Sequence, residues 1–339
     1  MPKLAPLRLL RANRLIRSNR LKFLAVLAAE LAGLRYTVVR LDPAAACNLR
    51  CTMCYFSNPD WVDGNTGRRL NAEELRAVAD AFFPEALLVY IGCGFEPTVY
   101  KGYPEIVRLA KERGVRFVSL VTNGQLLTEE AVSQLIGYGL DEIVVSAHGV
   151  RPDTYHRFMP RASHEKLHRN LDMLTRLRRA SGRETPVLRI NYTVNRENLE
   201  ELPELLEAFA AYDLRCLQVR PITNQDGAVF AGYELDGCLD TYRRVMAQVA
   251  MQCAEAGVTL MSNMEDPTIR QANPHAVVYE NAVLRTISPN LVWRDGLHRA
   301  EDYRAFKRSI GFRRRLLGWA LDGGSGLARP TALAGSSVN

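Results

Sequence analysis

The stretch Cys47-Asn-Leu-Arg-Cys51-Thr-Met-Cys54-Tyr55 places three thiols within eight residues. It directly follows residues 36–41, an apolar, β-branched run that is typical of a strand. Thiolates are soft ligands that suit iron–sulfur clusters or zinc. A structural zinc site takes four protein ligands, and no fourth Cys or His lies close by. A [4Fe–4S] cluster held by three thiolates instead keeps one iron open to another ligand.

Strand-like and helix-like segments alternate through the rest of the chain. The predicted strands are residues 36–41, 86–91, 115–121, 142–146, 187–194, 215–220 and 258–261. The helical patterns between them are residues 72–83, 105–113, 129–138, 165–179, 199–212 and 239–256. This alternation predicts right-handed βα units around a parallel sheet, with functional groups at the carboxyl ends of the strands.

The spacing CxxxCxxC at the end of a first strand resembles the radical S-adenosylmethionine (SAM) superfamily, in the branch of the molybdopterin-precursor enzymes. The resemblance implies an α/β fold, a partial (βα)6 TIM-like barrel. It also implies that Cys47, Cys51 and Cys54 hold a [4Fe–4S] cluster whose open iron binds SAM. A reduced cluster of this kind cleaves SAM to a 5′-deoxyadenosyl radical, which takes hydrogen from a substrate. The residue before the last cysteine is commonly aromatic in the family; here it is Met53, and Tyr55 is expected to fill that space.

Polar residues follow the second and third predicted strands. Gly92-Cys93-Gly94-Phe95-Glu96-Pro97 resembles the family's GGEP motif, which holds the amino group of SAM, with Phe95 in place of the usual second glycine. Glu96 is the carboxylate expected to carry that role. Thr122, Asn123 and Gly124 form a turn signal at the same end of the barrel.

The fourth, fifth and sixth strands supply further candidates. By resemblance, Ser146 bonds the ribose or carboxylate of SAM. His148 either contacts substrate or satisfies backbone groups of the turn. Arg189, Asn191 and Thr193 recur at period two and are predicted to share one face. Arg189 is a candidate clamp for the SAM carboxylate. Arg220, and Arg40 by resemblance to the molybdopterin-precursor branch, are candidate substrate contacts.

The chain has seven cysteines, an odd number that argues against a disulfide framework. The four outside the cluster are Cys93, Cys216, Cys238 and Cys253, and none follows Cys253. Many relatives carry a C-terminal SPASM domain with auxiliary clusters. Here only residues 287–312, with Trp293 and Tyr303-Arg304, echo its ending, so one cluster is expected. Cys93 or Cys238 is either a buried structural thiol or a group that returns hydrogen to a substrate radical.

Charge is concentrated at the amino end of the sequence. Residues 1–40 hold nine basic residues and one acid, whereas the net charge of all 339 residues is +7. The apolar run 23–34 spans about 18 Å as a helix, too short for a bilayer core of about 30 Å. This segment either packs a Leu/Phe face on the barrel and shows its arginines to water, or lies on an anionic membrane or acidic partner. The Arg-rich stretch 304–315 lacks a readable nucleic-acid module, so a solvated helix face is expected and nucleic acid is not.

Together these features predict four parts: a basic helix at 1–34, the barrel at 35–262, a degenerate SPASM-like extension without a cluster at 263–321, and a disordered tail at 322–339. An oxygen-sensitive cluster predicts a reducing compartment, the cytoplasm, with membrane association left open. We expect a flavodoxin- or ferredoxin-like electron donor and a small-molecule substrate such as a sugar, cyclitol or lipid precursor. A peptide-modifying enzyme and a non-catalytic metal-binding barrel are the alternatives.

Overall fold

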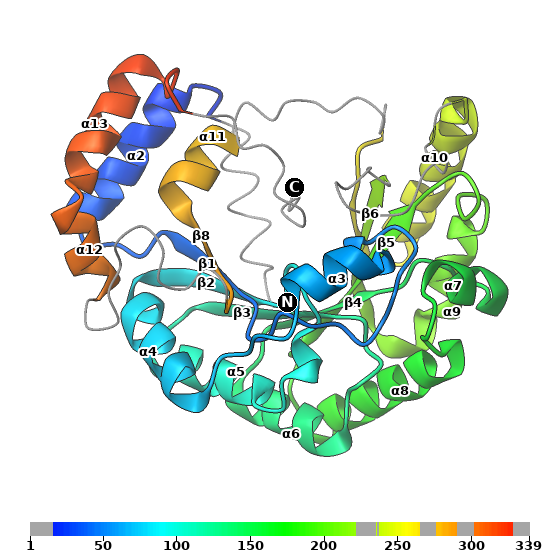
Figure 1. Cartoon of the computed structure of the whole chain (residues 1–339). Helices are drawn as coiled ribbons and strands as arrows, with labels where there is room; N and C mark the ends of the chain where they lie inside the picture. Colours follow the sequence, from blue (N-terminus) through cyan, green and yellow to red (C-terminus); the bar gives the residue numbers. More distant parts are fainter. Residues whose placement is uncertain (1–15, 222–234, 236, 265–275, 290–301, 328–339) are drawn as a thin grey trace.

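A computed structural model describes residues 16–221, 235, 237–264, 276–289 and 302–327. Its core is one sheet of eight parallel strands in the order β7-β6-β5-β4-β3-β2-β1-β8. Figure 1 shows this sheet curving round, with helices along its outside. The strands are β1 Thr37–Leu41, β2 Ala86–Ile91, β3 Phe117–Thr122, β4 Glu142–Ser146, β5 Val187–Val194, β6 Leu214–Pro221, β7 Thr259–Met261 and β8 Leu284–Ile287.

The helices of the barrel follow the strands in sequence and cover the outer face of the sheet (Figure 1). They are α4 Ala72–Phe82, α5 Tyr103–Glu112, α6 Glu129–Tyr138, α7 Pro152–Phe158, α8 His164–Ala180, α9 Leu205–Ala208 and α10 Leu239–Glu255. The short helix α3 Pro59–Asn65, after the cysteine loop, instead lies across the middle of the barrel in Figure 1. The pattern at 199–212 predicts one continuous helix, and this is wrong. The segment instead forms η4 Leu202–Glu204, α9 and η5 Ala210–Tyr212, with Pro203 in the first of these short turns.

Alternation along the strands separates two faces of the sheet. Val39 and Leu41 of β1 are fully buried in the large core beneath the helices. Val38, one residue before Val39 and therefore on the other side of the pleat, belongs to a separate cluster with Tyr90 and Phe117 on the inner face. Because side chains two apart share a face, Arg40 lies on the inner side with Val38. Polar groups on that side are therefore surrounded by the barrel.

All seven predicted strands form, and β8 is added to them. It pairs in parallel with β1, with Arg40 opposite Thr286, so it covers the edge that β1 would otherwise expose. The predicted six strand–helix pairs thus become an eight-stranded sheet whose end strands are β7 and β8. β8 comes from residues that the sequence assigns to a separate C-terminal extension. Part of the SPASM-like segment, including Trp293, and the tail from 328 lie outside the described residues.

Helices from the two ends of the described chain lie side by side at one edge of the barrel (Figure 1). These are α2 Asn19–Leu31, α12 Tyr303–Ser309 and α13 Phe312–Asp322, next to α11 Ala276–Val278 and η6 Tyr279–Val283. Phe23, Phe312 and Leu316 are buried in their shared core. The outward side of α2 carries leucines such as Leu21 and Leu31, about 60% exposed. Among the described residues, no helix has the length and apolarity needed to cross a membrane.

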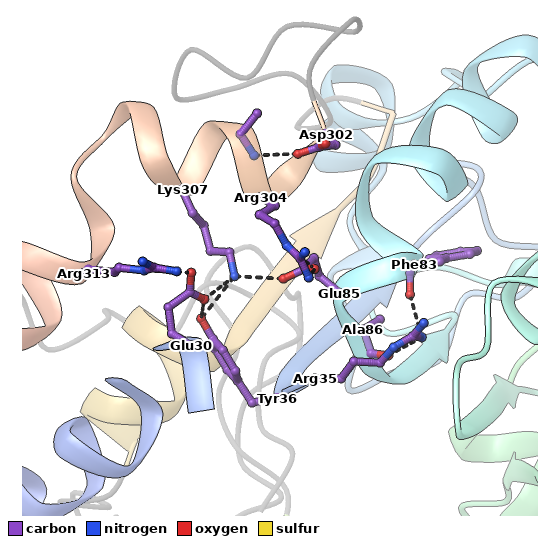
Figure 2. A network of polar contacts seen from close by, with 11 residues as sticks. Glu30, Arg35, Tyr36, Phe83, Glu85, Ala86, Asp302, Arg304, Lys307 and Arg313 are labelled. Atoms are coloured by element: carbon purple, nitrogen blue, oxygen red, sulfur yellow. Dashed lines mark hydrogen bonds and ion pairs between the residues drawn. The ribbon is translucent and has the colours of Figure 1, made fainter. Parts of the chain in front are cut away.

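A buried lysine joins this group of terminal helices to the barrel (Figure 2). Lys307 of α12 is 2% exposed and donates to Glu30 of α2 and, at 3.0 Å, to Glu85 beside β2. Its ammonium also lies 3.3 Å from the hydroxyl of Tyr36 and faces the Tyr36 ring. Glu85 also forms an ion pair with Arg304, with 2.5 Å between Glu85 Oε1 and Arg304 Nη2. We call Glu30, Tyr36, Glu85, Arg304 and Lys307 the Lys307 network.

Candidate active site

The three predicted ligand thiols lie in the loop after β1, where the carboxyl ends of the strands meet. Cys47, Cys51 and Cys54 are each half-buried. The amide of Leu49 donates to the Cys47 sulfur at 3.4 Å, and the amide of Cys54 donates to the carbonyl of Cys51 at 3.0 Å. Met53, at the usual aromatic position, instead packs against Phe158 of α7.

The chemistry of these thiols fits a metal cluster. Burial raises the pKa of Cys47 to about 12, and burial also raises the pKa of Cys51 and Cys54. Cys47 and Cys54 further raise the pKa of Cys51, because three thiolates so close would repel each other. Without a metal the thiols are therefore protonated, and a bound cation would stabilise them as thiolates.

Within the described part of the chain, no three His, Cys, Asp or Glu side chains gather in a way that would hold a metal ion. A [4Fe–4S] cluster poses a different geometric demand, because it distributes three thiolates over three iron atoms. Three half-buried sulfurs lie on one short loop, and Cys47 and Cys54 both raise the pKa of Cys51, an arrangement that is compatible with such a cluster.

The glycine-rich turn after β2 lies against this loop. Gly92 has φ +82°, and a Cβ at this position would lie 2.4 Å from the carbonyl oxygen of Val121, so only glycine fits. The hydroxyl of Tyr55 donates to the carbonyl of Gly94. The predicted turn and the predicted aromatic residue are thus brought together. Tyr55 itself is buried, and its ring centroid lies 3.9 Å from that of Trp61, with the two rings tilted by 46°.

Asp42, which the sequence analysis missed, holds the same turn. Its carboxylate accepts from the amides of Cys93 at 2.8 Å, Gly94 at 3.2 Å and Phe95 at 3.3 Å. Burial raises the pKa of Asp42 to about 6, although these amides and Arg40 favour the charged form. An acid directly after an apolar strand, in register with a glycine turn on the next strand, is the signal that could have identified it.

Glu96 is buried among hydrogen-bond donors from this part of the chain. Its Oε1 accepts from the Thr98 amide at 3.1 Å, the Thr98 hydroxyl at 2.5 Å and the Thr122 hydroxyl at 2.6 Å. Its Oε2 accepts from the amide of Asn123 at 2.8 Å. The Asn123 side chain donates in turn to Asn48 of the cysteine loop at 2.9 Å. Glu96 and its neighbour Pro97 therefore link the glycine turn, the end of β3 and the cysteine loop.

The predicted residues on β4 and β5 lie on adjoining strands. Ser146 is paired in register with Asn191, whose Oδ1 is buried without a hydrogen-bond partner. His148 accepts at Nδ1 from the amide of Thr193 at 3.1 Å, which places its ring proton on Nε2. Burial, with repulsion from Arg220, lowers the pKa of His148 to about 4, so the ring is neutral.

Three arginines from different strands enter the barrel interior. Arg189 on β5 forms an ion pair with Glu142 on β4 at 2.5 Å, and its Nε is buried without a hydrogen-bond partner. Arg40 on β1 is 1% exposed, and its Nε and Nη2 have no hydrogen-bond partner. Arg220 on β6 interacts electrostatically with Arg40, Arg189 and Cys93.

The four remaining cysteines lie in different parts of the structure. Cys93 is in the glycine turn near Asp42 and Arg40, and burial raises its pKa to about 12. Cys238 precedes α10 and packs against the core beneath the helices. Cys216 and Cys253 are buried. Of the two predicted hydrogen donors, only Cys93 lies beside the predicted SAM-binding turn.

Comparison with known proteins agrees with this arrangement. Residues 42–209 match the family model of the Radical SAM superfamily. The tungsten-containing aldehyde ferredoxin oxidoreductase cofactor-modifying protein of Pyrococcus furiosus is 32% identical over 171 residues, 49% of this chain and 46% of that protein. The PqqA peptide cyclase of Bradyrhizobium diazoefficiens is 29% identical over 191 residues, 56% and 47% of the two chains. The chain thus spans about half the length of the curated relatives it matches.

A solved structure is similar in fold. The crystal structure of Streptococcus suis SuiB bound to S-adenosylmethionine superposes with a TM-score of 0.60. The match covers 86% of this chain and 68% of SuiB at 15% sequence identity. At that identity the likeness concerns the partial barrel alone.

Proposed function

Because this chain belongs to the radical SAM superfamily, whose members use a [4Fe–4S] cluster and SAM, we propose that it is an enzyme acting on a small molecule such as a sugar, cyclitol or lipid precursor. The observation that supports the proposal is the loop that contains Cys47, Cys51 and Cys54. Hydrogen bonds connect this loop to the glycine turn through Tyr55 and to the end of β3 through Asn123. When bound, the cluster supplies the electron that cleaves SAM into methionine and a radical able to take hydrogen from a substrate.

The chain's own residues position SAM in this proposal. Glu96 already accepts three hydrogen bonds at Oε1 but only one at Oε2, so Oε2 retains a lone pair for an ammonium group. Asn191 Oδ1 lacks a donor, which a ribose hydroxyl beside Ser146 would supply. Gly92 lets the turn pack against the Val121 carbonyl and Pro97, where a side chain would clash, and Thr122 and Asn123 keep Glu96 in place.

A peptide substrate is the second candidate. One curated relative is named a PqqA peptide cyclase, and its match extends over 56% of this chain. We rank a small molecule first because strand residues Arg40, Arg189 and Asn191 carry buried polar atoms without hydrogen-bond partners, which a small molecule enclosed in the barrel could satisfy. Incubating the enzyme with SAM and separate pools of cell metabolites and peptides would decide, because 5′-deoxyadenosine should rise above the uncoupled level only with the class that contains the substrate.

Two partners complete the proposal. A flavodoxin- or ferredoxin-like protein in the cytoplasm would supply the electron; replacing dithionite with such a donor should sustain SAM cleavage.

The leucines on the outer side of α2, including Leu21, Leu24 and Leu31, together with Arg17 and Arg20, suit peripheral contact with an anionic membrane. Co-sedimentation with phosphatidylglycerol vesicles but not with phosphatidylcholine vesicles is expected; equal recovery with both would reject the contact.

The central experiment compares three purified proteins under anaerobic conditions. The unaltered chain should be brown, contain about four irons and form 5′-deoxyadenosine from SAM. Cys51→Ala should lose the cluster and the product, whereas the matched Cys253→Ala, altered at a buried thiol on α10, should keep both. A colourless unaltered protein with one zinc would favour a non-catalytic metal-binding barrel. Normal turnover by Cys51→Ala would refute the assignment of the ligands.

A further inference from the structure

Two histidines on α8, outside the residues assigned to SAM, bring their Nε2 atoms close together. His164 and His168 are four positions apart on this helix, a spacing that places two side chains on one helix face. Their Nε2 atoms lie 3.2 Å apart, and their ring centroids lie 4.4 Å apart with a tilt of 47°. The rings therefore lie beside each other rather than end to end, because an end-to-end contact would add the radii of both rings to the separation of the nitrogens.

A backbone oxygen and a tyrosine determine where the protons of this pair lie. The carbonyl of Val150, in the turn between β4 and α7, lies 2.9 Å from His164 Nε2, and a carbonyl can only accept, so this Nε2 carries a proton. His168 Nε2 is then the acceptor facing it. The proton of His168 is therefore on Nδ1, which donates to the hydroxyl of Tyr212 at 2.8 Å. Two nitrogens and one carbonyl oxygen thus share a single proton.

This arrangement of lone pairs matches the ligand spacing of a transition-metal ion. Zinc binds imidazole nitrogen at about 2.0–2.1 Å with tetrahedral angles, so two nitrogens on one zinc lie about 3.3 Å apart. The two Nε2 atoms are 3.2 Å apart, and the Val150 oxygen is 2.9 Å from the nearer one. The bond from His168 Nδ1 to Tyr212 is the kind of outer contact that orients the ring of a ligating histidine.

The surroundings of the pair favour a cation and give it access. Asp172, one turn beyond His168 on α8, interacts electrostatically with His168. The ring of Tyr155 lies 5.4 Å from that of His164. The ring of Phe209 lies 5.2 Å from that of His168, so the pair is flanked by aromatic side chains. Both histidines are only partly buried, so solvent reaches them.

We propose that His164, His168 and the Val150 carbonyl bind a divalent transition-metal ion such as zinc. The ion would replace the proton between the two Nε2 atoms, and His164 would carry its proton on Nδ1 instead, so no net proton is released. Over the described ranges, His, Cys, Asp and Glu side chains form no three-membered group suited to a metal ion, so water would complete the coordination. A metal at this position would tie α8 to the turn that carries His148, and the proposal does not depend on the proposed function.

The test titrates zinc chloride into the reconstituted full-length protein under anaerobic conditions and measures binding by calorimetry. The unaltered protein should bind zinc, whereas magnesium, which prefers oxygen ligands, should not bind at this site. His164→Gln and His168→Gln should each weaken zinc binding about tenfold or more, because each removes one of two imidazole ligands. His156→Gln is the matched control: its ring is exposed on α7 beside the His164 amide, and it should bind zinc like the unaltered protein.

X-ray absorption at the zinc edge identifies the ligands independently of iron. Nitrogen and oxygen neighbours at about 2.0–2.2 Å are expected, and a sulfur shell at about 2.3 Å would overturn the proposal because the zinc would then lie on cysteines. The same measurement separates this site from a zinc held by Cys47, Cys51 and Cys54, the result that would reject the proposed function. Equal zinc affinity in His164→Gln, His168→Gln and the unaltered protein would also overturn it.

Tyr212→Phe keeps both ligands and removes only the acceptor of His168 Nδ1. It should bind zinc about tenfold more weakly and keep the nitrogen and oxygen shell. Zinc should raise the melting temperature of the unaltered protein but not that of the two glutamine variants. If a glutamine variant melts lower before zinc is added, Tyr212→Phe decides, and unchanged zinc affinity in it overturns the proposal. Iron content and 5′-deoxyadenosine formation without zinc should be the same in all variants, so failure here leaves the proposed function intact.

Discussion

Replacing Lys307 by methionine should destabilise the protein strongly and in a pH-dependent manner. Methionine keeps most of the volume of the side chain and removes only its charge. Glu30 would then keep only the Tyr36 hydroxyl and the more distant Arg313 at 3.8 Å, and Glu85 would keep only the partly exposed Arg304. Removing one partner of a buried ion pair costs about 3–5 kcal/mol, because the other charge remains buried and uncompensated.

The expected shifts follow from the length of the chain and from Glu30. At about 2.1 cal/mol/K per residue, 339 residues lose about 1.4 °C of melting temperature per kcal/mol, so a fall of about 4–7 °C is expected at pH 7. Burial raises the pKa of Glu30, but Lys307 and Tyr36 outweigh burial, and the folded pKa is lowered. The pairing therefore stabilises above the unfolded pKa of 4.5 and is lost as pH falls through the folded value. In Lys307→Met the largest influence lowering the pKa of Glu30 is gone, and only Tyr36 and Arg313 still oppose burial, so the deficit should shrink towards pH 4 as the carboxylates protonate.

Scanning calorimetry at pH 7 and pH 4.5 measures the fall in melting temperature and its dependence on pH. Hydrogen exchange on α2 and α12 measures the local loss of stability. Arg308→Met is the matched control: it alters the next residue of the same helix at an exposed position, where about 0.5 kcal/mol or less is expected. Adding Glu30→Gln to Lys307→Met should restore part of the loss. A deficit below about 1 kcal/mol, or one that is the same at both pH values, would refute the reasoning.

Two further predictions concern the strand ends. Gly92→Ala should lower the melting temperature by several degrees, because its Cβ would lie 2.4 Å from the Val121 carbonyl at φ +82°. The control Gly137→Ala, inside α6 with nothing within 4 Å, should raise it slightly, and equal effects would contradict the assigned geometry. His148→Asn keeps an acceptor for the amide of Thr193 but cannot titrate. Since the folded pKa of His148 is about 4, the unaltered protein loses stability as pH falls from about 6.5 towards 4, by up to about 3 kcal/mol. Urea unfolding should show a smaller loss in His148→Asn; parallel pH profiles would contradict this.

Local sequence signals were sufficient for most of the barrel. Apolar runs bounded by turn residues identify all seven strands from β1 to β7, and α6 begins and ends at the residues its pattern predicts. β8 was missed because Leu284–Ile287 is four residues long and contains Arg285 and Thr286. Its stability comes from pairing with β1, far away in the sequence, and no local pattern encodes that contact.

The candidate site likewise contains some features that local motifs predict and others that depend on contacts between strands. The cysteine spacing and the glycine turn are local motifs, and the structure brings them together through Tyr55. Asp42 and the ion pair of Arg189 with Glu142 depend on register between neighbouring strands. A single sequence does not specify that register, so the carboxylate of Glu142 beside Arg189 could not be predicted from it.

The Lys307 network also constrains the order in which the protein is completed on the ribosome. The Lys307–Glu30 bond joins residues 277 positions apart, and β8 reaches β1 from nearly as far. The strands β1 to β7 can pair while α12 and α13 are still untranslated. Until the later residues are synthesised, Glu30 has no Lys307 to bind and β1 has no β8 to pair with. During that interval Phe23 of α2 has no α13 to pack against, which makes this nascent species the one most exposed to chaperones and to aggregation.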